Sequence, residues 1–362
     1  MRRPPKALVL AGGVGTRARP FTHTCAKQLL PLANRPVLFW VLDEIAASEI
    51  HRVGLVTTPE NHEEIRAAAD QEFGRTLELT YLVQKSPTGL AHAVSTARSY
   101  LGDDDFLMYL GDEFLLGGAA LLLEDFARLR PAAGVLVAPV EDPRAFGVVE
   151  TGPGGRVRRL TEKPAQPRSN LALTGVYAFT PRIHNAIDRL VPSPRGELEI
   201  TDAVQVLVED GRQVRSTRSP GHWCDTGSVE GLLRANELAL EAMHPQLLGQ
   251  VKGNCEITGP VHLDEGSRVE DCTIVGPVVI GTGTHVRDSF IGQYTSIGQD
   301  CAIQNSHVED SVLLSNTTVT GVERLSRSVL GRHTRVESEP TTSSGTEHHL
   351  VLGDHSRVVL RR

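Results

Sequence analysis

Short apolar runs alternate with segments of helical spacing over roughly the first 250 residues. The apolar runs predict buried strands over Ala7–Leu10, Val53–Thr57, Leu79–Val83, Phe106–Leu110 and Val135–Val140. Between them, helical spacing predicts helices over Val37–Ile50, Glu60–Asp70 and Leu90–Tyr100. Because strands and helices alternate, we expect a largely parallel sheet covered by helices on both faces. Ligands of such sheets bind beyond the carboxyl ends of the strands, so candidate site residues should follow the strands.

A different period begins near residue 250, where aliphatic residues recur six positions apart with occasional slips of one residue. These residues are Val251, Ile257, Leu263, Val269, Val275, Ile280, Val286, Ile291, Ile297, Ile303, Leu313, Val319, Leu325, Leu330 and Val336. Small residues fall four positions after several of them, at Thr284, Thr295, Cys301 and Thr334. Such a hexapeptide repeat is typical of a parallel β-helix, whose interior is filled by stacked aliphatic side chains. The change of period predicts two domains, residues 1–245 and residues 246–362.

Composition and charge exclude several classes of protein. The formal net charge of −7 and the 4% of aromatic residues argue against a nucleic-acid binder and against attraction to anionic membranes. No stretch approaches the roughly 18 apolar residues that span a bilayer, and the run Ala7–Ala11 is too short for a signal-peptide core. The five cysteines stand far apart without a Cys-x-x-Cys pair, which predicts free thiols in a reducing compartment. We therefore expect a cytoplasmic protein without nucleic-acid or membrane partners.

The first expected strand runs directly into glycines, in the segment Leu10-Ala11-Gly12-Gly13-Val14-Gly15-Thr16-Arg17. Glycines after a strand let backbone N–H groups approach phosphate oxygens closely. Residues 13–18 also fit the dinucleotide pattern G-x-G-x-x-A, but that pattern requires an acidic residue at the end of the next strand. The acidic candidates, Asp43 and Glu44, lie inside the first expected helix instead. Lys27 follows Arg17 by ten residues, and two cations that bracket a glycine loop suit a triphosphate.

These residues resemble the motifs of the nucleotidyltransferases that join a nucleoside triphosphate to a sugar 1-phosphate. The family pattern G-G-x-G-T-R-L-x-P-x-T matches residues 12–22, with Ala18 in place of leucine, and a P-K-Q-L-L-P-like segment matches residues 27–31. Glu113 replaces the asparagine of the family's G-D-N sequence. Further matches are Gln84, Gly89–Ala93, Leu110–Asp112, Phe146–Val148, Glu162–Pro164, Gly175–Tyr177, Arg195–Asp202 and Trp223–Gly227. The chain is most similar to long-form glucose-1-phosphate thymidylyltransferases of deoxysugar and antibiotic pathways, which end in a hexapeptide β-helix.

The resemblance implies a fold, a reaction and a set of site residues. The fold would be a Rossmann-like domain with a mostly parallel mixed sheet, followed by a left-handed parallel β-helix. The reaction would transfer a thymidylyl group from dTTP to glucose 1-phosphate with Mg²⁺ as cofactor, in a homo-oligomer. By resemblance, Arg17 and Lys27 are catalytic, and Asp112 and Asp225 are metal ligands. The implied nucleotide-binding residues are Leu10, Gly12, Gly13, Gly15, Thr16, Gln84 and Gly89. The implied sugar-phosphate-binding residues are Gly147, Glu162, Lys163, Val176 and Arg195.

Other functions stay open at this point. The substrates could be another triphosphate (UTP, GTP or ATP) or another sugar or carbasugar 1-phosphate. Hexapeptide β-helices often carry acyl transfer with a histidine base, and His262, His285, His307 and His333 are available for it. A regulatory subunit of the same fold would be expected to lose a catalytic cation or an acidic metal ligand, and none is lost here. Taken alone, Gln84 could be a surface amide, and Trp223 could belong to the core.

Overall fold

The computed structural model describes residues 5–13, 15–338 and 346–361. Contacts divide the chain into two compact units, and each is described by itself. The first unit contains residues Met1–Gly13 and Val37–Cys224, and the second contains Val14–Pro36 and Asp225–Arg362. Residues 14–36 therefore pack with the C-terminal part of the chain. The expected domain boundary between residues 245 and 246 stays a prediction.

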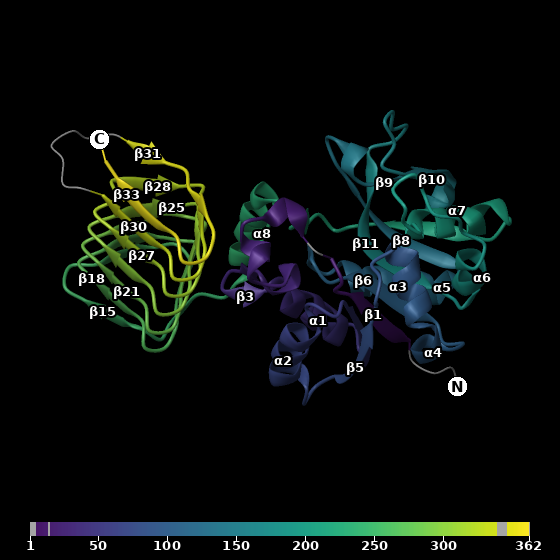
Figure 1. Cartoon of the computed structure of the whole chain (residues 1–362), viewed down its shortest axis with the longest axis horizontal. Helices are drawn as coiled ribbons and strands as arrows, with labels where there is room; N and C mark the ends of the chain where they lie inside the picture. Colours follow the sequence, from purple (N-terminus) through teal and green to yellow (C-terminus); the bar gives the residue numbers. More distant parts are fainter. Residues whose placement is uncertain (1–4, 14, 339–345, 362) are drawn as a thin grey trace. The chain divides into compact units, whose positions relative to one another are not determined.

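The first unit is built on a nine-stranded mixed sheet in the order β10-β9-β11-β6-β1-β4-β5, with β8 between β11 and β12 (Figure 1). Its strands are β1 (Lys6–Leu10), β4 (Arg52–Thr57), β5 (Glu78–Val83), β6 (Phe106–Leu110), β8 (Ala133–Pro139), β9 (Gly147–Thr151), β10 (Val157–Glu162), β11 (Leu171–Phe179) and β12 (Val214–Arg218). Strands β5, β4, β1 and β6 pair in parallel, whereas β11 pairs antiparallel with β6, β8 and β9. The predicted Rossmann-like mixed sheet is confirmed. The burial predicted for β5 is wrong, because this strand is the edge of the sheet and none of its side chains is buried.

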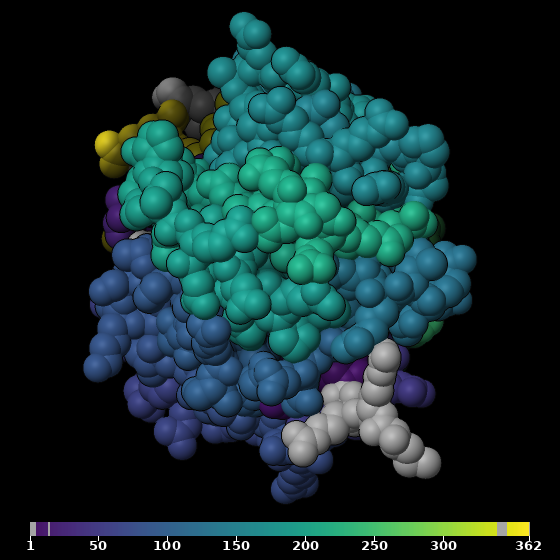
Figure 2. Space-filling model, turned by 90° about the vertical axis from the view of Figure 1, so that its right-hand side faces the viewer, coloured from purple at the N-terminus to yellow at the C-terminus, as the bar shows by residue number. Residues whose placement is uncertain are grey.

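Helices cover both faces of this sheet. They are α1 (Val37–Ala47), α2 (His62–Phe73), α3 (Leu90–Thr96), α4 (Arg98–Leu101), α5 (Gly118–Leu129), α6 (Arg182–Ile187) and α7 (Ile200–Glu209). On one face, Leu8 and Met108 share a core with residues of α3, α6 and α7. On the other face, α5 packs closely on β8, because a Cβ on Gly134 of β8 would touch Leu122 and Phe126 of α5. The predicted helix Leu90–Tyr100 is broken between α3 and α4. Figure 2 shows the surface from the side on which α6 and α7 lie.

Short elements complete the first unit. Strands β7 (Glu113–Leu115) and β13 (Trp223–Asp225) form a two-stranded sheet. Two 3₁₀ turns, η4 (Pro143–Ala145) and η5 (Pro153–Gly155), flank β9. No helix in the described part of the chain is long and apolar enough to cross a membrane.

The C-terminal part of the second unit is a parallel β-helix, as predicted (Figure 1). One sheet contains β14 (Gln246–Leu247), β17 (Val261–Leu263), β20 (Val278–Ile280), β23 (Thr295–Ile297), β26 (Val312–Leu313), β29 (Val329–Leu330) and β32 (Val351–Leu352). The second contains β15 (Gln250–Lys252), β18 (Arg268–Glu270), β21 (His285–Arg287), β24 (Ala302–Gln304), β27 (Thr318–Thr320), β30 (Arg335–Ser338) and β33 (Arg357–Leu360). The third contains β16 (Glu256–Thr258), β19 (Thr273–Val275), β22 (Phe290–Ile291), β25 (His307–Glu309), β28 (Arg324–Ser326) and β31 (Glu347–His348). The left-handed sense of the coil stays a prediction.

The interior of the β-helix differs from the predicted aliphatic stack at three positions. Val251 of β15 is 44% exposed and does not belong to the interior. Ile274, and not the adjacent Val275, is the fully buried residue of β19. Val308 of β25 is also fully buried, although the six-residue period passed over it. Val275 was predicted because the step from Val269 to Ile274 is one residue shorter than the six-residue period. Val308 was passed over because the coil from Ile303 to Val319 contains two such short steps, on either side of Val308. Cys301 is buried, as predicted.

Residues 15–36 and one helix precede the β-helix within the second unit. The segment contains three 3₁₀ turns, η1 (Thr16–Ala18), η2 (Phe21–His23) and η3 (Lys27–Leu29), and a hairpin of β2 (Pro31–Leu32) and β3 (Arg35–Pro36). Helix α8 (Val229–Ala242) packs against β2. Ser228 accepts a hydrogen bond from the Gly231 backbone and begins this helix as its N-cap.

Candidate active site

The first unit gathers sequence-predicted residues where its parallel strands end. Gly12 and Gly13 come shortly after β1, and Gln84 directly follows β5. Gly111 and Asp112 directly follow β6. These strands belong to one parallel run, β5-β4-β1-β6, so their carboxyl ends share one edge of the sheet. This is the edge at which ligands bind in such folds.

Gln84 is a buried part of this edge and not a surface amide. Its side chain is 4% exposed, and its Nε2 donates to the Gly89 carbonyl at 3.3 Å. The same nitrogen lies 2.8 Å from His92 Nδ1. Gly89 has φ of +110°, and a Cβ there would lie 2.4 Å from the Leu198 carbonyl oxygen, so only glycine fits. The amide is thus held in one orientation, as a group that recognises a ligand by hydrogen bonds requires.

Gly12 lets the chain pass close to the same amide. A Cβ on Gly12 would lie 3.3 Å from Thr58 Cγ2 and 3.4 Å from Gln84 Oε1. Leu10, the last residue of β1, is 5% exposed, so its side chain belongs to the core. Val14 lies outside the described residues. A loop without side chains at this edge suits backbone contact with a nucleotide.

A second group of predicted residues lines a cavity of about 650 Å³ in the first unit. Glu162 Oε2 accepts a hydrogen bond from the Thr201 hydroxyl at 2.6 Å. Lys163 Nζ lies 3.8 Å, and Arg195 Nη1 3.9 Å, from Glu162 Oε1. Arg195 Nη2 also lies 3.2 Å from Glu199 Oε1. Two cations beside an oriented carboxylate can hold a phosphate and hydroxyl groups together, which is the pattern of a sugar phosphate.

Carboxylates of the same cavity are affected by burial. Burial raises the pKa of Glu199 above its ordinary value, although a hydrogen bond from the Ser193 hydroxyl opposes the shift. Burial also raises the pKa of Asp202, with a smaller contribution from the charge of Glu162. Burial thus disfavours the charged forms of Glu199 and Asp202, and hydrogen-bond donors such as the hydroxyl groups of a ligand can offset this cost.

Gly147 and Val176 have only their backbones to offer a ligand. A Cβ on Gly147 would lie 2.6 Å from Leu173 Cδ1, 2.9 Å from Thr201 Oγ1 and 3.2 Å from Glu162 Oε2. Glycine at this position therefore allows the Thr201–Glu162 hydrogen bond. Val176 is fully buried in β11, so its side chain cannot touch a ligand.

The structure explains the glutamate that replaces the family asparagine after Asp112. Glu113 is 8% exposed, and its Oε2 accepts a hydrogen bond from Trp223 Nε1 at 2.9 Å. The Trp223 ring also meets Phe146 edge-on, with centroids 5.4 Å apart. Trp223 is half-buried, so it lies at the margin of the core. Glu113 thus supports an aromatic pair, while Asp112 remains the half-buried residue of this turn.

In the second unit, the two cations that the resemblance predicts to be catalytic lie at one carboxylate. Arg17 Nη2 donates to Asp225 Oδ2 at 3.2 Å, and Lys27 Nζ lies 3.9 Å from Asp225 Oδ1. The Arg17 side chain is 63% exposed, whereas that of Lys27 is only 7% exposed. The Arg17 guanidinium is therefore accessible to solvent, whereas the Lys27 ammonium is held in place by burial. Two positive charges against one negative charge leave this cluster suited to an anionic ligand.

Glycines permit this arrangement. The Gly227 N–H donates to Asp225 Oδ1 at 2.8 Å, and a Cβ on Gly227 would lie 2.6 Å from Arg17 Nη2. Gly15 has φ of +67°, a region that favours glycine, and it comes directly before Thr16 at the start of η1. A Cβ on Gly15 would lie 3.0 Å from Lys27 Cβ.

The predicted metal ligands fit magnesium only together with a phosphate. The described residues contain no group of three or more histidine, cysteine, aspartate or glutamate side chains that could hold a metal ion. Magnesium usually binds through one or two carboxylates, waters and substrate phosphates, and needs no such group. Asp112 is a carboxylate of the first unit and Asp225 one of the second, and the Arg17 pair shows that the Asp225 carboxylate already accepts a positive partner.

The histidines considered for acyl transfer do not come together. His262 lies on β17, His285 on β21 and His307 on β25, which belong to three different sheets. His333 stacks on His355 with centroids 4.8 Å apart. This arrangement therefore does not place them around one cleft in which a histidine could act as the base of acyl transfer.

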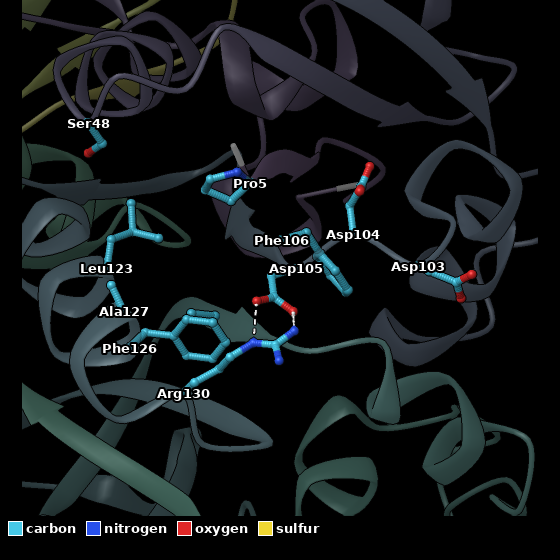
Figure 3. A pocket seen from close by; sticks show the side chains of 11 residues that line it. Pro5, Ser48, Asp103, Asp104, Asp105, Phe106, Leu123, Phe126, Ala127 and Arg130 are labelled. Atoms are coloured by element: carbon cyan, nitrogen blue, oxygen red, sulfur yellow. Dashed lines mark hydrogen bonds and ion pairs between the residues drawn. The ribbon is translucent and has the colours of Figure 1, made fainter. Parts of the chain in front are cut away.

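Another cavity, of about 500 Å³, lies at the opposite end of β6 (Figure 3). It is lined by Phe126 and by Asp105, which directly precedes β6. Arg130 donates to both oxygens of Asp105, at 2.9 and 3.0 Å. The cavity is thus at the amino end of the strand, away from the edge where ligands of parallel sheets bind.

Sequence reasoning passed over several residues that complete these groups. Thr201 and Glu199 lie within the matching segment 195–202, and His92 lies within the matching segment 89–93, but no role was predicted for any of the three. The sequence did point to Gly227, because it ends the matching segment Trp-Cys-Asp-Thr-Gly two residues after Asp225, the predicted metal ligand. Its role in making room for Arg17 depends on a contact across 210 residues, which no local pattern shows.

Comparisons with known proteins find relatives of similar sequence and structures of similar fold. Residues 6–242 match the nucleotidyl transferase family. A glucose-1-phosphate thymidylyltransferase of Streptomyces griseus is 48% identical over 353 residues, covering 97% of this chain and 98% of the relative. A low-salt glycan biosynthesis nucleotidyltransferase of Haloferax volcanii is 42% identical over 358 residues, covering 98% and 100%. A Bacillus anthracis structure described as a glucose-1-phosphate thymidylyltransferase, in complex with a sucrose, has a TM-score of 0.61 at 31% identity, covering 67% of this chain and 98% of that one.

Proposed function

The chain belongs to the nucleotidyl transferase family, and we propose that it transfers a thymidylyl group from dTTP to glucose 1-phosphate. One observation carries the proposal: Arg17 and Lys27 meet at the Asp225 carboxylate, and this cluster is suited to a triphosphate. The cavity around Glu162 offers the hydrogen-bonding and cationic groups that a sugar phosphate needs. Streptomyces relatives with 48% identity bear the name of this activity.

In the proposed reaction, an oxygen of the sugar phosphate attacks the α-phosphorus of dTTP. A new P–O bond forms, the bond between the α-phosphorus and its bridging oxygen breaks, and the electron pair leaves with pyrophosphate. The attacking oxygen is already ionised at neutral pH, so no base is required. Catalysis then consists of positioning and of stabilising charge.

Each charged side chain has a proposed role in this reaction. Lys27, which is buried and fixed, holds the α-phosphate, and exposed Arg17 holds the departing β- and γ-phosphates. Lys163 and Arg195 hold the phosphate of the sugar. Glu162, oriented by the Thr201 hydroxyl, accepts hydrogen bonds from sugar hydroxyls.

Asp112 and Asp225 are the proposed ligands of magnesium. A bound magnesium ion would neutralise charge that builds on the phosphate oxygens. The carboxylate of Asp225 would then exchange part of its present contact with Arg17 for the metal, which leaves Arg17 available to the leaving group.

We assign recognition of the thymine base of dTTP to the Gln84 side chain. Its buried amide can pair with the edge of a pyrimidine, and a mismatched purine would leave buried polar groups unpaired. Thymine and uracil differ by one methyl group, which discriminates only about 10- to 200-fold. We therefore expect dTTP to be the best substrate, UTP a weaker one, and ATP and GTP poor ones.

The test is a matrix of nucleoside triphosphates against sugar 1-phosphates, read by pyrophosphate release in the presence of Mg²⁺. The proposal predicts the highest kcat/KM for dTTP with glucose 1-phosphate. A preference for another base or another sugar 1-phosphate would move the chain to a different activity within its family. Silence with every pair would refute the enzymatic function. A cytoplasmic location and a homo-oligomeric state belong to the same proposal, and size-exclusion chromatography tests the second.

A further inference from the structure

The segment that carries Arg17 and Lys27 is tied to the last coils of the β-helix. The Thr24 hydroxyl donates to Asp354 Oδ2 at 2.8 Å, across 330 residues of chain. The other carboxylate oxygen, Asp354 Oδ1, accepts the backbone N–H of Arg332 at 2.7 Å. One carboxylate thus bridges a turn of the coil to the segment between the two catalytic cations.

A second contact lies beside the first. Arg332 Nη2 donates to Cys25 Sγ at 3.4 Å, and Cys25 is only two residues before Lys27. A Cβ on Gly353 would lie 3.0 Å from Pro20 Cβ, so the segment and the coil are also in close contact there. These contacts flank Thr24 on both sides along the chain.

The far end of the segment is held by amide side chains. The hairpin turn between β2 and β3 places Ala33 at φ of +48° and Asn34 at φ of +62°. Asn34 Nδ2 donates to the Ile297 carbonyl of β23 at 2.7 Å. Asn236 of α8 is 1% exposed, and its Oδ1 accepts from the Ala33 N–H at 2.9 Å and from the Ser296 hydroxyl at 2.7 Å. A left-handed alanine is unfavourable, so these bonds stabilise a turn that would not form readily alone.

Packing alone does not hold residues 29–36 of the segment against the coil. A cavity of about 220 Å³ remains there, lined by Leu29 and Asn34 from the segment and by Gln299 and Arg332 from the coil. The hydrogen bonds of Thr24 and Asn34 therefore contribute more to the position of the segment than they would if side chains filled this space.

We propose that the β-helix positions the triphosphate-binding cations, with Asp354 as the main positioning residue. This inference rests on the proposed function, because it assigns the segment to the triphosphate. It goes further in giving the C-terminal coils a part in substrate binding. Asp354 acts through Thr24 on the segment that carries Lys27, and it does not touch substrate.

The test compares two variants that break the Thr24–Asp354 hydrogen bond from opposite sides. Asp354→Ala removes the bridge, and Thr24→Val removes only its hydroxyl and leaves the Asp354–Arg332 contact in the coil intact. Losing one hydrogen bond to a charged group corresponds to a change of about ten-fold, so we expect the KM for dTTP to rise by about that factor in each variant. The KM for glucose 1-phosphate should stay within about two-fold, because its proposed groups lie in the first unit. The double variant should show no further rise, because both changes break the same bond.

A matched control separates positioning from general damage to the coil. Asp271 Oδ1 accepts the Asn254 backbone N–H at 2.8 Å, which is the same coil-to-coil contact that Asp354 makes with Arg332. Asp271 also has φ of +53°, so Asp271→Ala should lower Tm at least as much as Asp354→Ala. It should leave both KM values unchanged.

Calorimetric binding of dTTP with Mg²⁺ distinguishes the failure of this inference from that of the proposed function. An active wild type whose Asp354→Ala and Thr24→Val variants keep the KM and Kd for dTTP would overturn the inference alone, even if Tm fell. A wild type that binds dTTP without turnover would refute the proposed function, and the Kd values of the variants would still decide the inference. A wild type that binds no nucleoside triphosphate would overturn both.

Discussion

Gly227→Ala should damage catalysis while leaving the fold intact. The variant needs no unusual backbone, because φ of Gly227 lies outside the left-handed region. Its Cβ would nevertheless lie 2.6 Å from Arg17 Nη2 and 2.7 Å from Asp225 Oδ1. Van der Waals contact needs about 3.5 Å, so one or both charged groups must move by roughly 1 Å. A displacement of that size at reacting groups costs up to about 10²-fold, and we expect kcat/KM to fall about 10- to 100-fold.

The stability of the variant should change little. The Arg17 side chain is 63% exposed, and ion pairs of this kind contribute at most about 1 kcal/mol. The matched control is Gly211→Ala, where no atom lies within 4 Å of the new Cβ but φ is +70°. That change should cost about 1–3 kcal/mol of stability and leave activity unchanged. Pyrophosphate release and thermal unfolding measure both variants. If Gly227→Ala kept wild-type kcat/KM, or lost it only together with its fold, the steric argument would be wrong.

Three further predictions concern charge, base recognition and pH. Asp112→Asn and Asp225→Asn should each lower kcat by about 10²-fold or more, and excess EDTA should stop the wild type; turnover in EDTA would contradict the metal assignment. Gln84→Ala should lower kcat/KM for dTTP and narrow its advantage over ATP and GTP, as steady-state kinetics with the four triphosphates would show, whereas an unchanged ratio would exclude Gln84 as the base reader. Burial lowers the pKa of His184, and the charge of Arg98 adds to the shift. The unfolded chain therefore binds the proton more readily, so stability should fall as pH drops below about 6.5, and His184→Gln should reduce that loss in Tm measured at pH 7.5 and 5.5.

Local patterns were sufficient wherever a residue's environment follows from its neighbours in sequence. The strands that precede Gly12 and Asp112 were predicted because central strands of such sheets are continuous apolar runs. The same run at residues 79–83 did not reveal that β5 is an edge strand, since its position depends on strands elsewhere in the chain. In the β-helix, Ile274 and Val275 are adjacent aliphatic residues, and only the length of the coil's short side decides which of them faces inward.

The sequence motifs predicted which residues belong to the site, but they did not predict the hydrogen bonds that hold those residues in place. The residues around Glu162 lie within one unit, on β10 and at the start of α7. Thr201, which orients Glu162, lies inside the matching segment 195–202, so its position could be predicted although its hydrogen bond to Glu162 could not. Asp354 gave no such signal. It lies in a turn of the β-helix, and its partner Thr24 is 330 residues away.

The two proposed substrates therefore depend on different supports. The groups proposed for the sugar phosphate are fixed by the sheet and α7 of the first unit, which residues 37–224 form with β1. The cations proposed for the triphosphate lie on a segment whose bonds run to Ile297, Arg332 and Asp354 in the coils. A change in those coils can consequently alter the handling of the triphosphate without altering that of the sugar. This gives a physical reason for a nucleotidyltransferase to keep a β-helix after its sheet: the coils hold a loop that is too short and too rich in turns to hold its own shape.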